Sequence, residues 1–256
     1  MRFTSLIRTP VAAFAAVAIL ATAGTGVAFA AAAFIKAAVA DSHRPAEDTA
    51  RDAARKPTDM LAFSGVKPGD KVIELLPGGG YFTRLFSVAV GPTGAVYGAV
   101  PAADGPEGNQ TKGVTAIAAD PHYANVKVVQ IGPGMLIPGG ADVVWTSQNY
   151  HDLYLTRVKL DTAQFDKLLF NAVKPGGVLI VLDHVANAGA PVVATADALH
   201  RIDPAAAKKA LVAAGFVYAG ESKVLRNKAD DHSKGVFDPA IRGHTDQFVY
   251  KFRRPK

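Results

Sequence analysis

The stretch VIELLPGGGYFTRLF, Val72–Phe86, decides the fold of this 256-residue chain. Its apolar start around Glu74 indicates a short buried strand, which Pro77 and the three glycines Gly78–Gly80 end in a tight turn. From Tyr81 on, apolar residues recur at helical spacing. A loop between a first strand and its helix lies at the carboxyl end of a parallel sheet, where open α/β folds bind ligands. Glycines in that loop let the backbone approach a ligand closely.

The rest of the chain alternates short apolar strands with helices. A helical segment interrupted at Pro57 precedes the first strand, and later strands and helices are expected at residues 95–100, 124–131, 141–147, 161–173, 178–185 and 204–216. The last two strands, 216–225 and 246–252, are joined without a helix by the polar segment Asn227–Thr245, either a lid or a flexible loop. This order predicts an α/β fold: a Rossmann-like, doubly wound, mainly parallel seven-stranded sheet with a C-terminal antiparallel strand pair.

Composition excludes several kinds of chemistry. The chain has no cysteine, so disulfides, thiolate metal sites and cysteine nucleophiles are excluded. Its formal charge is +6, but three basic residues lie in the first 40 positions, and without them 25 basic and 22 acidic residues leave +3. Because the charges are mixed along the chain with no long basic block, we expect no nucleic-acid partner.

The N-terminus has the pattern of a secretory signal peptide. A short basic start, MRFTSLIR, precedes the almost wholly apolar stretch Pro10–Phe34, and A-x-A cleavage sites lie at Ala28–Ala30 and Ala38–Ala40. We therefore expect residues 1–40 to be a signal peptide, residues 41–256 to form a single domain, and the mature protein to be periplasmic. The alternative is an uncleaved membrane anchor, because the apolar stretch is about long enough to span a bilayer. Only in that case would the protein associate with a membrane.

The glycine spacing excludes two common nucleotide-binding loops. A phosphate loop needs G-x-x-x-x-G-K-[ST], and neither Lys-Ser nor Lys-Thr follows Gly80. A dinucleotide fingerprint needs G-x-G-x-x-G, whereas these glycines are contiguous and residues 81–83 hold no further glycine. What remains is an acid followed by glycines four and six positions later, Glu74, Gly78 and Gly80.

This arrangement resembles motif I of class I S-adenosylmethionine-dependent methyltransferases, whose usual form is an acid followed by x-G-x-G-x-G. The order of elements from about Arg55 to Phe252 is similar to that family, as are VKPGGVLIVLDH at the fifth strand and NYHDL after the fourth. HRID at 200–203, AAGF at 213–216 and the ending GHTDQFVYKF resemble a group of exported bacterial proteins known chiefly as predicted methyltransferases. The resemblance implies the class I methyltransferase fold and methyl transfer from S-adenosylmethionine to an unidentified small-molecule acceptor.

Carried onto this chain, the resemblance implies a site for the amino-acid end of S-adenosylmethionine. A carboxylate at the strand end would accept from the cofactor ammonium, loop N–H groups would face its carboxylate, and an asparagine after the fourth strand would lie beside the sulfonium or the acceptor. The implied cofactor-binding residues are Glu74, Pro77, Gly78, Gly79, Gly80, Tyr81 and Asn149. A purely structural role in a turn is the alternative for the acid, the glycines and the asparagine.

Three positions depart from the family pattern. Leu76 stands where the first glycine of the motif is usual. Val100–Pro101 ends the second strand in place of an acid for the ribose, and Pro133 stands in place of an acid near the adenine. Asp104 or Glu107 in the following loop is a candidate replacement. These departures leave a second hypothesis open, a non-catalytic exported protein that binds a ligand on a methyltransferase fold.

Several side chains at the ligand-facing strand ends are candidates for acting on an acceptor. A base is needed only where the acceptor must lose a proton, and the candidates are His151, Asp183 and His184. His200 and Arg201, before the last helix, are candidates for contact with an anionic substrate. Structural or surface roles are the alternative for every histidine. No metal-binding spacing such as H-E-x-x-H occurs, so no metal site is predicted.

Overall fold

The computed structural model describes the chain apart from residues 2–32, 103–104, 106–107 and 133–136. Within that part, one sheet has the strand order β3-β2-β1-β4-β5-β7-β6. In this order, the strands from β3 through β2, β1 and β4 to β5 run parallel, and β7 runs antiparallel to both β5 and β6. The strands are β1 (Lys71–Leu75), β2 (Ala95–Pro101), β3 (Val126–Ile131), β4 (Ala141–Ser147), β5 (Val173–His184), β6 (Val217–Ser222) and β7 (Gln247–Arg253). The predicted sheet with its C-terminal antiparallel pair is confirmed.

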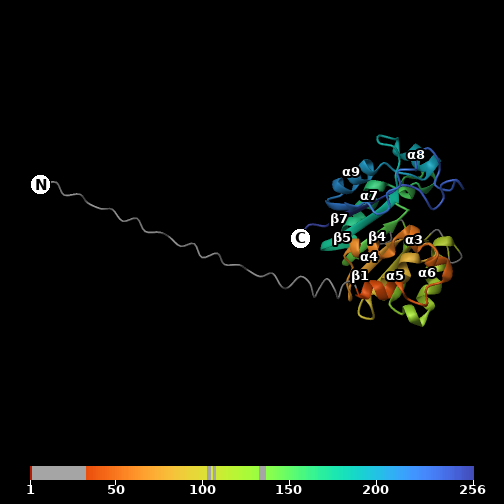
Figure 1. Ribbon diagram of the computed structural model, residues 1–256, viewed down its shortest axis with the longest axis vertical. Coiled ribbons are helices and arrows are strands. Elements are labelled where there is room, and N and C mark those ends of the chain that lie inside the picture. Colours follow the sequence, from red (N-terminus) through yellow and green to blue (C-terminus); the bar gives the residue numbers. More distant parts are fainter. Residues whose placement is uncertain (2–32, 103–104, 106–107, 133–136) are drawn as a thin grey trace.

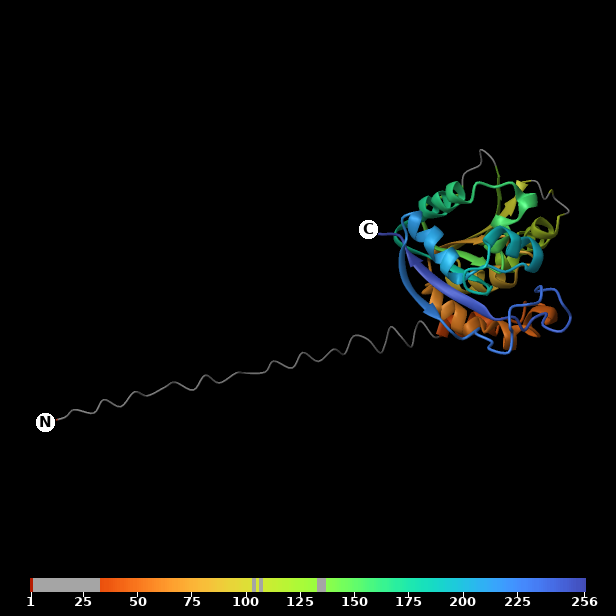
Figure 2. The ribbon, with the colours of Figure 1, turned by 90° about the horizontal axis from the view of Figure 1, so that it is seen from above.

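Helices cover both faces of this sheet. Figures 1 and 2 show the orange N-terminal helices on one side and the green-to-blue helices α7–α9 on the other. The α-helices are α2 (Ala46–Thr49), α3 (Asp52–Arg55), α4 (Pro57–Ser64), α5 (Tyr81–Val90), α6 (Asn109–Ala119), α7 (Thr162–Ala172), α8 (Val192–Leu199) and α9 (Pro204–Ala213). Short 3-10 helices are η2 (Pro121–Tyr123), η3 (His151–Tyr154) and η4 (Thr156–Val158).

Strand β1 shows how the sequence produces two cores. Val72 belongs to the core beneath α4–α6, whereas Ile73 and Leu75 belong to the core beneath α7 and α9. Parallel strands covered on both faces are apolar almost throughout, which explains the unbroken run before the glycines. Glu74 therefore points to the same side as Val72, toward α5, because side chains alternate along a strand.

Two elements differ from the sequence prediction. Strand β5 begins at Val173, so the KPGG turn expected to close α7 is already part of the strand. A Cβ atom on Gly177 would lie 2.9 Å from the carbonyl oxygen of Ala141, which explains why glycine is needed where β5 meets β4. Helix α8 is not predicted, because its β-branched residues, Val192, Val193 and Thr195, lower helix propensity.

Residues 33–39, which the sequence pattern assigns to the N-terminal segment, are helical and belong to the folded body. Ile35 is 6% exposed and Ala38 is fully buried in the core beneath α4–α6. The Arg44 guanidinium donates to the Val39 carbonyl at 2.6 Å, which fastens this segment to the helices that follow. Among the described residues, no helix combines the length and the apolar character needed to cross a bilayer.

Candidate functional site

The glycine turn lies at the switch point of the sheet. Strands β1 and β4 are neighbours, and the chain continues from β1 toward β2 on one side and from β4 toward β5 on the other. Ligands of open α/β sheets bind outside the carboxyl ends of the strands at such a point. The Asn149 side-chain amide donates to the carbonyl oxygens of Leu75 and Leu76 at 3.3 and 3.0 Å. Asn149 thus joins the end of β4 to the turn after β1.

Every second residue of the turn has a left-handed backbone. Leu76, Gly78 and Gly80 have φ angles of +50°, +56° and +78°. A left-handed backbone costs a residue with a Cβ about 1–2 kcal/mol. Leu76, which stands where the motif usually has its first glycine, adopts this conformation at that cost. A Cβ on Gly113 of α6 would lie 2.6 Å from the Gly78 carbonyl oxygen. Helix α6 therefore packs directly on the turn.

Glu74 is a buried acid at this turn. Its side chain accepts a hydrogen bond from the Thr83 hydroxyl at 2.5 Å, and the residue is 3% exposed. Burial raises the pKa of Glu74 to about 8, although the Thr83 hydrogen bond and the charges of Arg55 and Arg84 oppose the rise. At neutral pH the unliganded carboxyl is therefore mostly protonated. A cation bound beside it would favour ionisation.

Arg55 places a cation next to Glu74, which no sequence motif indicates. Its guanidinium lies 4.6 Å from the ring centre of Tyr81 and 5.3 Å from that of Phe82. It donates to the Gln148 side-chain oxygen at 2.8 Å. Within the described part of the chain, no carboxylate lies at ion-pair distance from it. The Tyr81 hydroxyl, by contrast, donates to Asp52 at 2.7 Å.

A buried polar network continues from Arg55 across the ends of the strands. The Gln148 amide donates to the Gln247 side chain at 3.2 Å, and the Gln247 amide donates to the Thr245 hydroxyl at 3.3 Å. His184 Nδ1 lies 2.7 Å from the same hydroxyl. Burial lowers the pKa of His184 to about 4. His184 is therefore a neutral imidazole at the inner end of this network.

The residues at the turn fit the amino-acid end of S-adenosylmethionine. Glu74 can accept from an ammonium group, and Arg55 can donate to a carboxylate. The Ser147 hydroxyl at the end of β4 is buried and has no hydrogen-bond partner among the described residues. The Gly78 N–H, expected to face the cofactor carboxylate, instead donates to the Gln110 side chain at 2.9 Å. Gly79 is exposed in the same turn.

The adenosine end is less complete. Strand β2 ends with the fully buried Val100 and then Pro101, and no carboxylate lies at its end among the described residues. Asp104, Glu107 and Pro133, which bear on the ribose and adenine contacts, lie outside the described residues. The fit to the cofactor is therefore argued from its amino-acid end alone.

Two of the three predicted catalytic residues form a pair. One oxygen of the Asp183 carboxylate accepts from the His151 backbone N–H at 2.7 Å. The other lies 2.7 Å from His151 Nδ1. Burial alone would lower the pKa of His151, but the charge of Asp183 and the hydrogen bonds of Asp152 and Asp183 raise it to about 10. His184 lies on the other face of β5, with its ring centre 5.9 Å from that of His151. The structure also brings His200 to His151, at 3.3 Å between Nδ1 and Nε2.

Arg201, predicted to contact an anionic substrate, is fully buried. Its guanidinium binds both carboxylate oxygens of Asp230, at 2.8 and 3.0 Å, and donates to the carbonyls of Lys234 and Val185. We therefore assign it to the structure of the segment Asn227–Thr245. That segment is fastened to the body at this point, which argues against a freely flexible loop.

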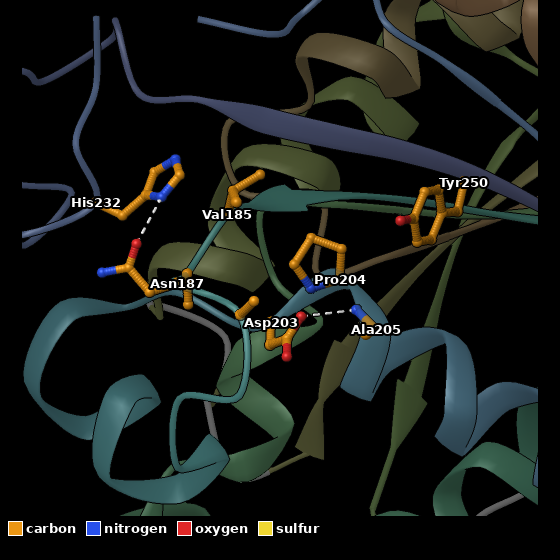
Figure 3. Close-up of a pocket in the computed structure, with 9 residues that line it drawn as sticks. Val185, Asn187, Asp203, Pro204, Ala205, His232 and Tyr250 are labelled. Carbon is orange, nitrogen blue, oxygen red and sulfur yellow. Dashed lines mark hydrogen bonds between the residues drawn. The ribbon is translucent and has the colours of Figure 1, made fainter. Parts of the chain in front are cut away.

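A surface pocket of about 370 Å³ lies beyond the end of β5, away from the glycine turn (Figure 3). Three of its polar side chains, those of Asn187, Asp203 and His232, are already paired. His232 points at Asn187, 3.1 Å away, and the Asp203 carboxylate accepts from the N–H groups of Ala205 and Gly189, each at 2.8 Å. These contacts shape the loop after β5 and the start of α9, so the pocket does not indicate a reaction.

Comparison with solved structures shows the fold. The chain is similar to an S-adenosylmethionine-dependent methyltransferase from Aquifex aeolicus, with a TM-score of 0.54 and 16% identity over 79% of this chain and 97% of that one. The fold is the class I methyltransferase fold. A chain of the complex between the Haloferax volcanii Trm112 methyltransferase activator and a predicted methyltransferase has a TM-score of 0.56 and 16% identity over 87% of this chain and 98% of that one. A predicted sarcosine dimethylglycine methyltransferase from Galdieria sulphuraria has a TM-score of 0.55 and 15% identity, over 79% of this chain and 84% of that one. No protein-family model and no curated protein sequence matches the chain.

Proposed function

We propose that the protein is an S-adenosylmethionine-dependent methyltransferase acting on a small-molecule acceptor. One observation carries the proposal: the buried acid Glu74, the left-handed turn and the cation of Arg55 meet at the switch point of a class I methyltransferase sheet. When bound, S-adenosylmethionine would supply a methyl group from its sulfonium to the acceptor.

Glu74 and Arg55 are complementary to an α-amino-acid group. The ionised Glu74 would accept from the ammonium, and the Arg55 guanidinium would donate to the carboxylate as a charged hydrogen bond. The Ser147 hydroxyl, which has no partner within the described part of the chain, would provide a further polar contact at the end of β4. Because alignment supplies most of the rate of an in-line transfer, holding this end of the cofactor is the main contribution expected of these residues.

If the acceptor must lose a proton, His184 is the histidine of the two that is unprotonated at neutral pH, although its low pKa makes it a weak base. The pKa of His184 is lowered by burial to about 4, so its imidazole is unprotonated at neutral pH. His151 instead has its pKa raised, against the effect of burial, by the carboxylates of Asp183 and Asp152. Its proton-accepting capacity at neutral pH is correspondingly small.

Arg55→Gln is expected to weaken binding of S-adenosylmethionine about tenfold or more, because a hydrogen bond to a charged group contributes about 1.5–3 kcal/mol. Isothermal titration of the purified protein measures the affinity. Arg51→Gln is the matched control. Arg51 also lies near the Tyr81 ring, at 5.1 Å, but its side chain is 49% exposed and pairs with Asp48. Its replacement should leave the affinity unchanged.

The same titration decides the proposal itself. An absence of binding heat at millimolar S-adenosylmethionine would contradict it. Binding that is never followed by release of S-adenosylhomocysteine, with a broad panel of small acceptors, would instead support the non-catalytic binding protein. Equal losses of affinity in the Arg55 and Arg51 variants would show that Arg55 does not bind the cofactor.

Binding should also release a proton from Glu74. The free carboxyl has its pKa raised by burial to about 8, and the ligand ammonium would lower it. Affinity should therefore rise up to tenfold per pH unit between about pH 6 and pH 8, and then fall as the ligand's own α-amino group, with a pKa of about 8, loses its proton. Titration in buffers of different ionisation enthalpy counts the protons released. Glu74→Gln should abolish the rise below about pH 8; a wild-type affinity that does not change between about pH 6 and pH 8 would argue against a protonated Glu74.

We also propose that the chain is exported and cleaved after Ala30 rather than after Ala40. Cleavage after Ala40 would remove Ile35 and Ala38, which are buried in the core. Mass spectrometry of the protein from its native host should therefore find a mature chain that begins at Ala31. An intact Met1 would favour the membrane-anchored alternative, and a chain that begins at Asp41 would contradict the choice of site.

A further inference from the structure

Three side chains beside β5 bring ligand atoms together in a nearly equilateral triangle. His151 Nε2 lies 3.3 Å from His200 Nδ1 and 3.3 Å from Asp152 Oδ1. His200 Nδ1 lies 3.4 Å from the same Asp152 oxygen. These separations are at or beyond the long end of a hydrogen bond, about 2.7–3.2 Å. Two imidazole nitrogens and a carboxylate oxygen thus converge on one point, joined to one another only by long hydrogen bonds.

The size of the triangle matches one metal geometry. Zinc in proteins takes nitrogen and oxygen ligands at about 2.0–2.1 Å in a tetrahedral arrangement. Ligand atoms on a tetrahedron of that size lie about 3.3–3.4 Å apart. An octahedral ion at about the same distance would draw them closer, to about 3.0 Å. The observed separations of 3.3, 3.3 and 3.4 Å therefore favour a tetrahedral ion.

A buried carboxylate orients the first of these ligands. Asp183 is fully buried, and its Oδ1 atom lies 2.7 Å from His151 Nδ1. Its other oxygen accepts the His151 backbone N–H at 2.7 Å. A carboxylate on one ring nitrogen fixes the orientation of the ring, as is usual for histidines that bind metals. Here it leaves Nε2 as the ring nitrogen that faces the triangle.

Backbone and charge also fit an ion at this place. His200 follows α8 with a left-handed φ of +53°, a strained conformation that clusters at functional sites. The carboxylates of Asp152 and Asp183 both lie against the His151 ring. A dication in the triangle would be paired with both of them, and buried charges are normally paired or bound to metals.

We propose that His151, Asp152 and His200 bind one Zn²⁺ ion, with a fourth tetrahedral position left open. Three protein ligands with an open position are typical of zinc sites that take part in chemistry. A second group of ligand atoms, on Asp41, His43 and His122, is less suited to an ion. There the two imidazole rings stack face to face with centres 3.6 Å apart, and the His43 side chain is 55% exposed.

Titration of the metal-free purified protein with Zn²⁺ tests the proposal, with Co²⁺ as the spectroscopic probe. We expect one ion per chain, the visible bands of tetrahedral cobalt, and a rise in the thermal unfolding midpoint on adding Zn²⁺. Asp152→Asn and His200→Asn should each weaken binding at least tenfold, and Asp183→Asn by about 10–100-fold. Asparagine tolerates the left-handed backbone of residue 200, so His200→Asn should fold normally.

His122→Asn is the matched control and should leave the zinc affinity unchanged. Three results would overturn the proposal: no stoichiometric binding by the wild-type chain, octahedral cobalt bands, or loss of the site in His122→Asn while His200→Asn keeps it. The midpoint shift of the wild-type protein needs no variant, so a misfolded variant cannot obscure the answer. S-adenosylmethionine is absent from these titrations, and their failure would leave the proposed methyl transfer unaffected.

Discussion

Arg201→Leu is expected to lower the free energy of unfolding by about 3–5 kcal/mol, because it breaks a buried ion pair by removing one partner. The Arg201 side chain is fully buried and that of Asp230 is 1% exposed. Asp230 also accepts the backbone N–H groups of His232 and Asp246, which keeps its carboxylate in place after the change. The variant would thus leave a buried charge without its counterion. Denaturant unfolding followed by circular dichroism measures the loss.

Arg226→Leu is the matched control in the same region. Arg226 binds both oxygens of Asp246 at 2.8 Å, but its side chain is 41% exposed. Pairs with an exposed partner contribute less than fully buried ones. The Asp246 side chain is 3% exposed, but it keeps the Asn227 N–H and the His232 ring nitrogen as partners, so this variant should lose less stability than Arg201→Leu. Replacing Arg201 and Asp230 together by leucine should recover much of the loss, since exchanging a whole buried pair for apolar residues is often nearly neutral. Equal losses in the two single arginine variants would show that burial of the pair is not what matters.

Hydrophobic periodicity was enough to predict the sheet. Strands such as β1 and β4 are buried on both faces and bounded by turn residues, so their apolar runs mark them without knowledge of neighbours. Helix α8 lacks such a signal, because its valines and threonine favour strands as much as helices. His200 follows α8 directly. A prediction without α8 could not bring His200 to His151.

The site could not be predicted in full, because some of its side-chain contacts join residues far apart in the sequence. The motif at Glu74 and the glycines predicted the turn, because its chemistry lies within seven residues. Arg55 reaches Gln148, 93 residues away, and no local pattern signals that contact. Arg201 was predicted to contact a substrate because the sequence indicated its position near the strand ends. The sequence did not indicate its partner Asp230, 29 residues away. Burial and pairing of charged residues are tertiary properties that a sequence pattern does not contain.

Gly113→Ala is expected to destabilise the protein by about 1–3 kcal/mol and to disturb the proposed cofactor turn. The added Cβ would lie 2.6 Å from the Gly78 carbonyl oxygen and 3.0 Å from the Gly79 Cα. Both atoms belong to the backbone, so neither can move aside as the end of a side chain could. Alanine within a helix contributes up to about 1 kcal/mol over glycine, but overpacking against a rigid neighbour typically costs about 1–3 kcal/mol. The steric cost should therefore prevail and push α6 away from the turn.

Gly79→Ala separates this effect from the loss of a glycine as such. No atom of the residues that the structure describes lies within 4 Å of a Cβ built on Gly79, and its φ is not in the left-handed region. Its stability should match that of the wild type, while Gly113→Ala should show both a lower unfolding free energy and a weaker affinity for S-adenosylmethionine. If Gly113→Ala kept its stability, α6 would not be held rigidly on the turn. If it lost stability but bound the cofactor normally, the turn would not be the part of the protein that holds the cofactor.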